Sequence, residues 1–270
     1  MKIGLIKEGK TPPDKRVPLS PKQCKWIQEK YPDIKLVVQK SPIRKYKDQD
    51  YLNEGITLVD KVEDCEVLLG VKEVPIDQLI PNKKYFFFSH TIKKQKYNRK
   101  LLQAILAKGI EMYDHEVIVN KKGQRLVAFG RYAGIVGAYN GFRTYGLKFN
   151  LYNLPKAELL HDQLMLIHEL QKLKLPNIKV VLTGKGRVGN GAKEMLKGMR
   201  MREVTVKEFL TETFEEPVYV QIDVLDYNKR KDGVVNNEQD FFNNPTEYDS
   251  NFMRFAKVAD MYIACHFYGD

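Results

Sequence analysis

KVVLTGKGRVGNGAKEML, residues 179–196, combines an apolar run, a glycine-rich turn and the start of a helix. Gly184, Gly186 and Gly189 give the spacing G-x-G-x-x-G between the expected strand and the expected helix. The first glycine permits a tight turn, the second lets the backbone approach a pyrophosphate, and the third permits close packing of helix on strand. The stretch therefore predicts a Rossmann-like dinucleotide-binding domain.

An acidic residue further along bears on the choice of cofactor. A strand is expected at 203–206, and Glu208 lies 19 residues after Gly189 (208 minus 189), about where a carboxylate binds the ribose hydroxyls of NAD. Arg187 and Val188 begin the expected helix and would lie beside the phosphates. Because Lys207, next to Glu208, and Arg187 could instead accept a 2′-phosphate, the sequence favours NAD and leaves NADP open. Glu208 could equally be an ordinary solvated glutamate.

The residues before this turn alternate strands with helical segments. Strands are expected at 2–7, 35–39 and 110–114, and near-continuous apolar runs, typical of strands buried on both faces of a parallel sheet, occur at 65–72 and 84–90. We therefore predict one open α/β domain over residues 1–127 and the dinucleotide-binding domain over 128–270. The predicted fold class is α/β, with two Rossmann-like open parallel-sheet domains and a cleft between them.

The start of the second domain is rich in glycine. Residues 129–146 have a helical period, and Gly134, Gly137 and Gly141 are spaced three and four apart, which places them on one face of a helix. A smooth face of this kind lets another backbone approach closely. We expect that approach at an interface between the two domains.

Ionisable residues stand where the predicted strands of the first domain end. Lys72, His90 and the pair Asp114 and Glu116 each close an apolar run. Ligands of open parallel sheets bind at the carboxyl ends of the strands, so these groups are expected to converge on one rim. A lysine desolvated among other cations loses proton affinity, and histidine titrates near neutral pH. Lys72 and His90 are therefore the candidate acid–base groups.

Three further cations are candidates for binding a carboxylate substrate. Lys10 and Arg16 lie in the loop after the first strand, where a guanidinium can bind a carboxylate through two hydrogen bonds. Arg125 lies nine residues past Glu116 (125 minus 116) and could do likewise, or could pair with that glutamate.

Composition limits the other classes of function. The net charge of +11 suits either nucleic acid or anionic small molecules. Because the basic clusters at 93–100 and 228–231 lack a nucleic-acid-binding fold signature, we expect no nucleic-acid partner. The three cysteines form no CxxC pair, which favours reduced thiols and no metal site. No run approaches the ~18–20 apolar residues of a membrane span, and the start lacks a signal-peptide pattern, so a cytoplasmic protein without membrane contact is expected.

Four stretches together resemble the group of saccharopine dehydrogenase (lysine-forming) and lysine–ketoglutarate reductase, within the alanine dehydrogenase and transhydrogenase N-terminal superfamily. They are KEGKTPPDKRVPLSP (7–21), LLGVKEVP (68–75), FFFSHTIKKQ (86–95) and YDHEVIVNKKGQRLVAFGRYAGIVGA (113–138). The last is the most specific, because it is much less similar to alanine dehydrogenases. TGKGRVGNGA and the residues after 243 also resemble the reductase domain of the animal bifunctional enzyme.

The resemblance implies a role for each candidate. It implies that Lys72 and His90 are the catalytic lysine and histidine, and that Arg16 binds a substrate carboxylate. Lys10 falls near the place of a paired lysine, in a loop one residue longer than the family's. The family's glutamate and arginine fall at Glu116 and Arg125, which implies that they contact substrate or modulate the two bases.

The implied reaction joins L-lysine and 2-oxoglutarate reversibly into saccharopine with a nicotinamide cofactor. An alanine or other amino-acid or opine dehydrogenase is the alternative enzyme, and an inactive nucleotide- or metabolite-binding homologue is the alternative outside enzymes. The family's chain runs on past the strand that corresponds to 259–267, whereas this sequence ends at Asp270. The second domain is therefore expected to be incomplete at its C-terminus relative to the family. Homo-oligomerisation is left open.

Overall fold

The structure, a computed structural model, describes residues 1–234 and 237–266. The chain divides into two compact units, Met1–Ala128 and Phe129–Asp270. The observed boundary lies one residue after the one drawn from the sequence. Each unit contains its own parallel sheet and its own buried core, so each is described by itself.

The first unit is built on six parallel strands in the order β3-β2-β1-β4-β5-β6. The strands are β1 (Lys2–Leu5), β2 (Lys35–Gln39), β3 (Thr57–Val59), β4 (Val67–Leu69), β5 (Lys84–Phe87) and β6 (Glu111–Asp114). The chain runs outward from β1 to β3 and then returns to β4 on the other side of β1. The strand order therefore reverses between β1 and β4, which is where open α/β sheets bind ligands.

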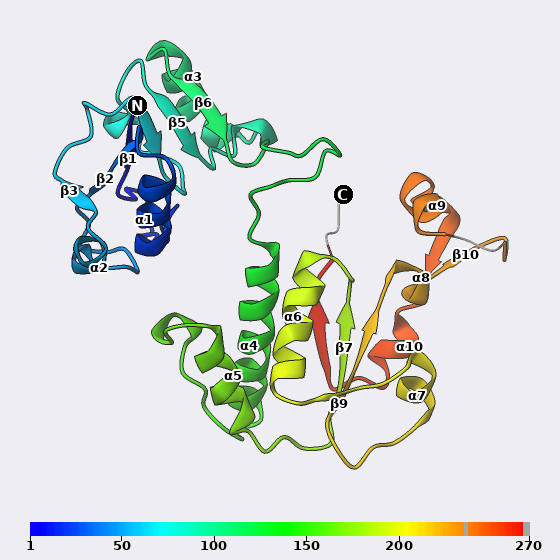
Figure 1. The fold of residues 1–270 in the computed structure, drawn as a ribbon. Coiled ribbons are helices and arrows are strands. Elements are labelled where there is room, and N and C mark those ends of the chain that lie inside the picture. Colours follow the sequence, from blue (N-terminus) through cyan, green and yellow to red (C-terminus); the bar gives the residue numbers. More distant parts are fainter. Residues whose placement is uncertain (235–236, 267–270) are drawn as a thin grey trace. The chain divides into compact units, whose positions relative to one another are not determined.

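Helices cover both faces of this sheet (Figure 1). They are α1 (Pro21–Lys30), α2 (Asp48–Asn53) and α3 (Arg99–Ala107), with 3₁₀ turns η1 (Ile76–Gln78), η2 (Thr91–Lys93) and η3 (Lys96–Asn98). Neighbouring residues of β2 point to opposite faces: Leu36 and Val38 pack with α1 and α2, whereas Val37 packs with α3. As the sequence predicts, α1 starts at Pro21 with Ser20 as its N-cap.

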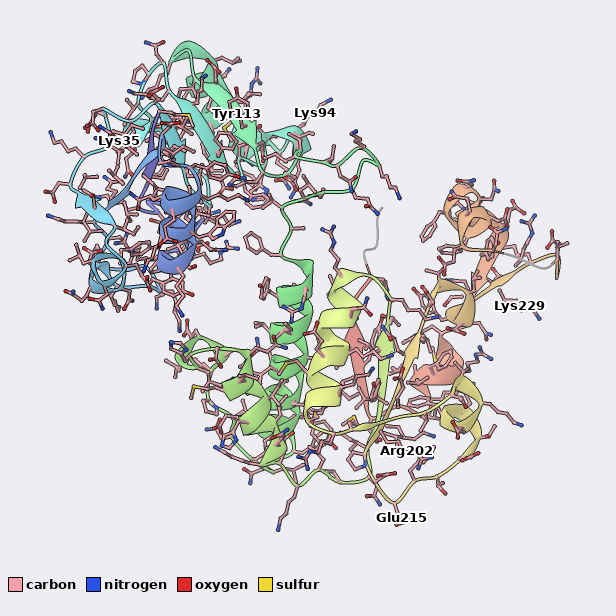
Figure 2. The ribbon with its side chains drawn as sticks, in the orientation of Figure 1. Lys35, Lys94, Tyr113, Arg202, Glu215 and Lys229 are labelled. Carbon is pink, nitrogen blue, oxygen red and sulfur yellow. The ribbon has the colours of Figure 1, made fainter. Side chains whose placement is uncertain are left out.

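The second unit has four parallel strands in the order β12-β7-β9-β8 among the residues that the structure describes. They are β7 (Lys179–Thr183), β8 (Arg202–Glu203), β9 (Val218–Ile222) and β12 (Met261–Ala264). A short antiparallel pair, β10 (Asn228–Arg230) and β11 (Tyr248–Ser250), forms an arm beside them, which Lys229 marks in Figure 2. Thus β9 and not β8 neighbours the strand that leads into the glycine turn.

Helices also lie on both faces of the second sheet (Figure 1). They are α4 (Gly130–Lys148), α5 (Gln163–Gln171), α6 (Arg187–Gly198), α7 (Val206–Thr211), α8 (Val224–Tyr227), α9 (Glu238–Asn243) and α10 (Met253–Ala256), with 3₁₀ turns η4 (Ala157–Leu159) and η5 (Pro245–Glu247). Val180 and Leu182 of β7 pack with α4 and α6, and Val181 packs with α7 and α10. The predicted α/β class with two Rossmann-like parallel sheets is confirmed. In the described ranges no helix combines the length and the apolar character that crossing a bilayer requires.

The glycine-rich helix is α4, and its close partner is a helix of the same unit. A Cβ atom on Gly134 would lie 1.9 Å from the carbonyl oxygen of Val188 in α6. By contrast, among the described residues nothing lies within 4 Å of a Cβ on Gly137, and a Cβ on Gly141 would meet only the flexible end of Met261. The expectation of three glycines serving an interface between domains is corrected: Gly134 serves the packing of α4 on α6.

The strand predicted at 203–206 is also corrected. β8 ends at Glu203, and the chain turns into α7, whose N-cap is Thr205. The Thr205 hydroxyl accepts the backbone N–H of Glu208, and the Glu208 carboxylate accepts the backbone N–H of Thr205. This capping box satisfies two N–H groups that a strand would leave to a neighbour, so the helix begins where the apolar pattern suggested a strand.

Candidate active site

The candidate residues of the first unit lie beyond the carboxyl ends of four adjacent strands. Lys10 and Arg16 follow β1, Lys72 follows β4, His90 follows β5 and Glu116 follows β6. Figure 2 labels two lysines that mark the edges of this sheet. Lys35 is at the amino end of β2. Lys94 follows β5, at the carboxyl ends of the strands, where the candidate residues also lie.

Three of the candidates are in direct contact. Lys72 Nζ lies 3.2 Å from His90 Nε2, and the other ring nitrogen, Nδ1, lies 3.2 Å from Glu116 Oε2. The side chains of His90 and Glu116 are 18% and 12% exposed, so a reactant can reach them while most bulk water is excluded. When Nδ1–H donates to Glu116, Nε2 is left to accept a proton from Lys72 Nζ. The arrangement is a lysine and a histidine able to exchange a proton, backed by a carboxylate.

A second carboxylate, Glu73, joins this cluster and was not among the residues singled out from the sequence. Its Oε1 lies 3.8 Å from His90 Nε2, and its Oε2 accepts a hydrogen bond from Lys10 Nζ at 2.9 Å. Burial raises the pKa of Glu73, but the hydrogen bond from Lys10, a backbone hydrogen bond and the charges of Lys10 and His90 together outweigh it and leave the pKa below its usual value. Glu73 directly follows Lys72 at the same strand end, which is the signal that could have identified it.

Glu116 also forms ion pairs with two basic side chains. Lys93 Nζ lies 3.2 Å from Glu116 Oε1 and 3.3 Å from His90 Nδ1, and Arg125 Nη1 lies 3.6 Å from Glu116 Oε1. Burial raises the pKa of Glu116, but hydrogen bonds with Lys93 and His90 outweigh it, and the pKa lies below its usual value. Glu116 therefore stays anionic beside the histidine. Lys93 was missed; it lies three residues after His90, in the turn that follows β5.

The backbone of His90 adopts a left-handed conformation, with φ of 55° and ψ of 12°. This conformation is uncommon for a residue other than glycine and needs support from its surroundings. Asp114, which sequence placed among the converging carboxylates, supplies that support: it accepts hydrogen bonds from the backbone N–H and the hydroxyl of the buried Ser89. The buried Asn98 amide donates to the carbonyl oxygen of His90. Asp114 thus anchors the turn that presents the histidine.

Arg16 forms a fork with Asp14. Its Nη2 and Nε donate to the two carboxylate oxygens at 2.6 and 3.0 Å. Burial raises the pKa of Asp14, but the hydrogen bonds from Arg16 outweigh it, and the pKa lies below its usual value. The Arg16 side chain is 43% exposed, so solvent reaches it. The sequence did not single out Asp14.

The glycine turn of the second unit has the geometry of a phosphate cradle. Gly184 has φ of +89°, which favours glycine, and a Cβ on Gly189 would lie 2.0 Å from the Gly184 carbonyl oxygen. Gly186 is the N-cap of α6, and none of the residues that the structure describes lies within 4 Å of a Cβ built on it. The space above Gly186 can therefore take a pyrophosphate at the positive end of the helix. Arg187 and Val188 are the first two residues of α6, as expected.

Glu208 lies away from this turn. Its carboxylate is occupied in the capping box of α7, and hydrogen bonds from Thr205 lower its pKa. α7 follows β8, which is separated from β7 by β9, a distance of about 10 Å across two strand spacings. The acidic residue at the adjacent strand end is Asp223, directly after β9. Ile222 directly precedes Asp223, and its carbonyl oxygen accepts the backbone N–H of Gly184 at 2.8 Å, so Asp223 lies beside the glycine turn.

Asp223 was missed because its distance along the chain exceeds the usual spacing. The signal was its place directly after the apolar run VYVQI. Its side chain is 18% exposed, caps α8 and lies 3.7 Å from Lys185 Nζ, in the middle of the glycine turn. A carboxylate and a lysine therefore stand together where the adenosine ribose of a dinucleotide would reach.

Replacing Gly186 by valine is expected to abolish binding of NADH without unfolding the protein. The backbone at Gly186 has φ of −76° and ψ of −167°, which any residue can adopt, and the added side chain would meet open space. It would fill the space above the helix end that a pyrophosphate needs. Titration of NADH fluorescence measures the affinity, and thermal unfolding measures stability. Unchanged affinity would remove the glycine turn from the site; Gly189→Val, which collides with Gly184, should instead destabilise the unit.

Two parallel sheets flanked by helices, with a glycine turn on one and ionisable strand ends on the other, define the architecture of Rossmann-like dehydrogenases. Over residues 4–136 the chain matches the family described as alanine dehydrogenase/PNT, N-terminal domain. Its fold resembles a transhydrogenase from Sinorhizobium meliloti, with a TM-score of 0.55 and 14% identity over 98% of this chain and 64% of that one.

The curated relatives are oxidoreductases of saccharopine and aminoadipic semialdehyde metabolism by name. The chain is 30% identical to alpha-aminoadipic semialdehyde synthase of Arabidopsis thaliana over 80% of its own length and 21% of that protein. It is 37% identical to the mitochondrial alpha-aminoadipic semialdehyde synthase of Bos taurus, over 54% of its own length and 16% of that protein. It is 26% identical to saccharopine dehydrogenase [NAD(+), L-lysine-forming] of Yarrowia lipolytica, over 64% of its own length and 51% of that protein. The chain thus spans about a fifth of the Arabidopsis synthase, about a sixth of the bovine synthase and about half of the fungal enzyme.

Proposed function

We propose that the chain catalyses the reductive condensation of L-lysine with 2-oxoglutarate, giving saccharopine, with a nicotinamide cofactor. The observation that carries this proposal is the contact of Lys72 Nζ with His90 Nε2 at 3.2 Å, backed by Glu116 on the other ring nitrogen. Similarity to saccharopine dehydrogenases and aminoadipic semialdehyde synthases supports the choice of substrates. In this proposal the first unit binds the amino acid and the 2-oxo acid, and the second binds the dinucleotide.

The chemistry requires proton transfers at two atoms of the substrates. The ε-amine of lysine must lose a proton to attack the keto carbon, and the resulting carbinolamine must gain a proton on its hydroxyl to leave as water. Lys72 and His90 can perform these two transfers in turn, because a proton passed from one to the other is available for the second. Glu116 holds His90 in one orientation and stabilises its protonated form.

The cations around this cluster suit dicarboxylate substrates. Arg16, Arg125 and Lys10 are each paired with a carboxylate of the protein, so their charges are balanced in the absence of substrate. Arg16 and Arg125 each have a side chain 43% exposed, so a substrate carboxylate can reach either guanidinium. We assign Arg16 and Arg125 to carboxylate binding and Lys10 to holding Glu73 beside His90.

The dinucleotide, when bound, supplies a hydride to the carbon of the substrate imine. The chain's part is to bind it: Gly184 and Gly189 shape the turn, Gly186 leaves room, and the N-terminus of α6 with Arg187 faces the phosphates. Asp223 would accept hydrogen bonds from the ribose hydroxyls of NAD. Because Lys185 lies beside it and could instead bind a 2′-phosphate, NADP remains the alternative.

Oxidation of NADH or NADPH in the presence of lysine and 2-oxoglutarate tests the proposal. The expected result is turnover that needs both substrates and forms saccharopine, detected by mass spectrometry. Turnover with pyruvate and ammonium instead would identify an alanine dehydrogenase. Cofactor binding without turnover of any amino acid would identify a binding homologue. Either result contradicts the proposal.

Replacing Asp223 by alanine is expected to weaken NADH binding, whereas Glu208→Ala should leave it unchanged. Asp223 stands at the strand end next to the glycine turn, and Glu208 caps a helix beyond β8. Loss of hydrogen bonds to a charged group costs about 1.5–3 kcal/mol, a factor of roughly ten to a hundred in affinity. Isothermal titration with NADH and NADPH measures both variants. The opposite pattern would return the ribose site to Glu208.

A further inference from the structure

Glu8 is a half-buried carboxylate that accepts hydrogen bonds from the backbone of Val71 and Lys72. It lies three residues after the end of β1, and its two oxygens face the loop after β4. Oε1 accepts the backbone N–H of Val71 at 2.7 Å, and Oε2 accepts the backbone N–H of Lys72 at 2.9 Å. One carboxylate thus satisfies two successive N–H groups, 63 and 64 residues away along the chain.

These two hydrogen bonds take the place of strand-to-strand hydrogen bonds just after β4, where the pairing of the strands ends. The last links from β5 to this loop are Gly70 N–H to the Phe86 carbonyl and Phe88 N–H to the Val71 carbonyl, at 2.8 and 3.0 Å. They leave the N–H groups of Val71 and Lys72 pointing away from β5, toward the loop after β1. Glu8 binds them from that side, so the Lys72 backbone is held between β5 and the β1 loop.

The surroundings of Glu8 fit a fixed role. Burial raises its pKa, and the hydrogen bonds from Val71 and Lys72 oppose that rise. Asp14 and Arg16 are the charged groups that act on it from its own loop, with opposite effects on the pKa. A desolvated carboxylate with both oxygens occupied has little freedom to move, which makes it a rigid support.

We propose that Glu8 is a positioning residue for Lys72. By fixing the Val71–Lys72 peptide, it sets the distance between Lys72 Nζ and His90 Nε2. This inference rests on the proposed function, in which those two groups exchange the proton. In Glu8→Gln the amide keeps one acceptor oxygen and turns an NH₂ donor toward the second N–H group. The peptide must then shift, and Lys72 Nζ shifts with it.

Glu66 provides a matched control in the same sheet. Its Oε1 accepts the backbone N–H of Lys2 at 3.1 Å, so it too is a carboxylate that binds a strand's N–H group. It lies at the opposite edge, before β4 begins, far from Lys72. Glu66→Gln makes the same chemical change without touching the peptide of Lys72.

Steady-state kinetics with lysine and 2-oxoglutarate separates the two variants. Glu8→Gln should lose about 10²-fold in kcat, the effect expected when a reacting group is misplaced by about 1 Å. Its KM values should change little, since Lys72 acts in the chemical step. Glu66→Gln should keep wild-type kcat. Wild-type kcat in Glu8→Gln, or equal losses in both variants, would overturn the proposal, whereas absence of turnover in the wild type would count against the proposed function instead.

Amide resonances give a test in the unaltered protein that needs no substrate. In ¹⁵N-labelled wild-type chain, the amide protons of Val71 and Lys72 should shift together as pH falls, with one common midpoint, because both donate to the same carboxylate. If the amides of Val71 and Lys72 do not titrate, or titrate with separate midpoints, Glu8 does not hold this peptide and the proposal fails, whether or not Glu8→Gln folds.

Discussion

Replacing His90 by glutamine, or Lys72 by methionine, is expected to lower kcat about 10²–10⁴-fold, the loss typical of one acid–base group. Glutamine keeps hydrogen-bonding groups near those of the imidazole but cannot exchange a proton at neutral pH. Methionine keeps the length of the lysine stem and removes the amine. Since Lys72 Nζ and His90 Nε2 lie 3.2 Å apart, each change also deprives the other group of its proton partner. KM should move little, because the loss falls on the chemical step.

Two surface variants serve as controls for this experiment. His161→Gln changes the same side chain at a position 78% exposed, and Lys84→Met removes a lysine that is half exposed beside Glu111. Both should keep wild-type kcat. The double variant of His90 and Lys72 should lose less than the product of the single losses, because the two residues act as one unit. Near-wild-type turnover in both single variants would mean that the chemistry lies elsewhere.

The placement of this cluster was within reach of the sequence, because adjacent parallel strands end at a common edge. That rule selected Lys72, His90 and Glu116, and the structure brings their side chains into contact. Their catalytic roles stay a prediction. The same rule overlooked Glu73 and Lys93, which stand one and three residues beyond residues already chosen. Their contribution depends on how each loop turns after its strand, which an apolar pattern does not encode.

The ribose carboxylate illustrates a different limit. The spacing from Gly189 to Glu208 assumes that the strand after α6 lies next to β7. In this chain β8 is two residues long and lies at the edge of the sheet, and β9 takes the place beside β7. Strand order is a property of non-local pairing, so counting along the sequence led to Glu208, whereas the neighbouring strand end carries Asp223. A capping box at Thr205 was the local signal against the predicted strand.

Gly134→Ala is expected to destabilise the second unit strongly, because the new methyl group has no room. It would lie 1.9 Å from the carbonyl oxygen of Val188 and 2.7 Å from the amide nitrogen of Ala192, both backbone atoms of α6. A flexible side chain could move aside, but a helix backbone cannot without separating α4 from α6. Overpacking of this kind costs about 1–3 kcal/mol, and backbone collisions fall at the upper end. Thermal unfolding should show a melting temperature lower by several degrees, at about 2–4 °C for each kcal/mol.

Gly137→Ala is the matched control, one turn further along the same helix. No atom in the part of the chain that the structure describes lies within 4 Å of its new Cβ, and alanine is favoured over glycine in a helix interior by about 0.5–1 kcal/mol, so this variant should be neutral or slightly more stable. The contrast also reaches the cofactor site. Val188 is the second residue of α6, two residues after Gly186, so moving α4 from α6 shifts the helix end that would face the phosphates. Gly134→Ala should therefore weaken NADH binding as well as stability, while Gly137→Ala keeps both. Equal melting temperatures for the two variants would mean that α4 and α6 do not approach each other this closely.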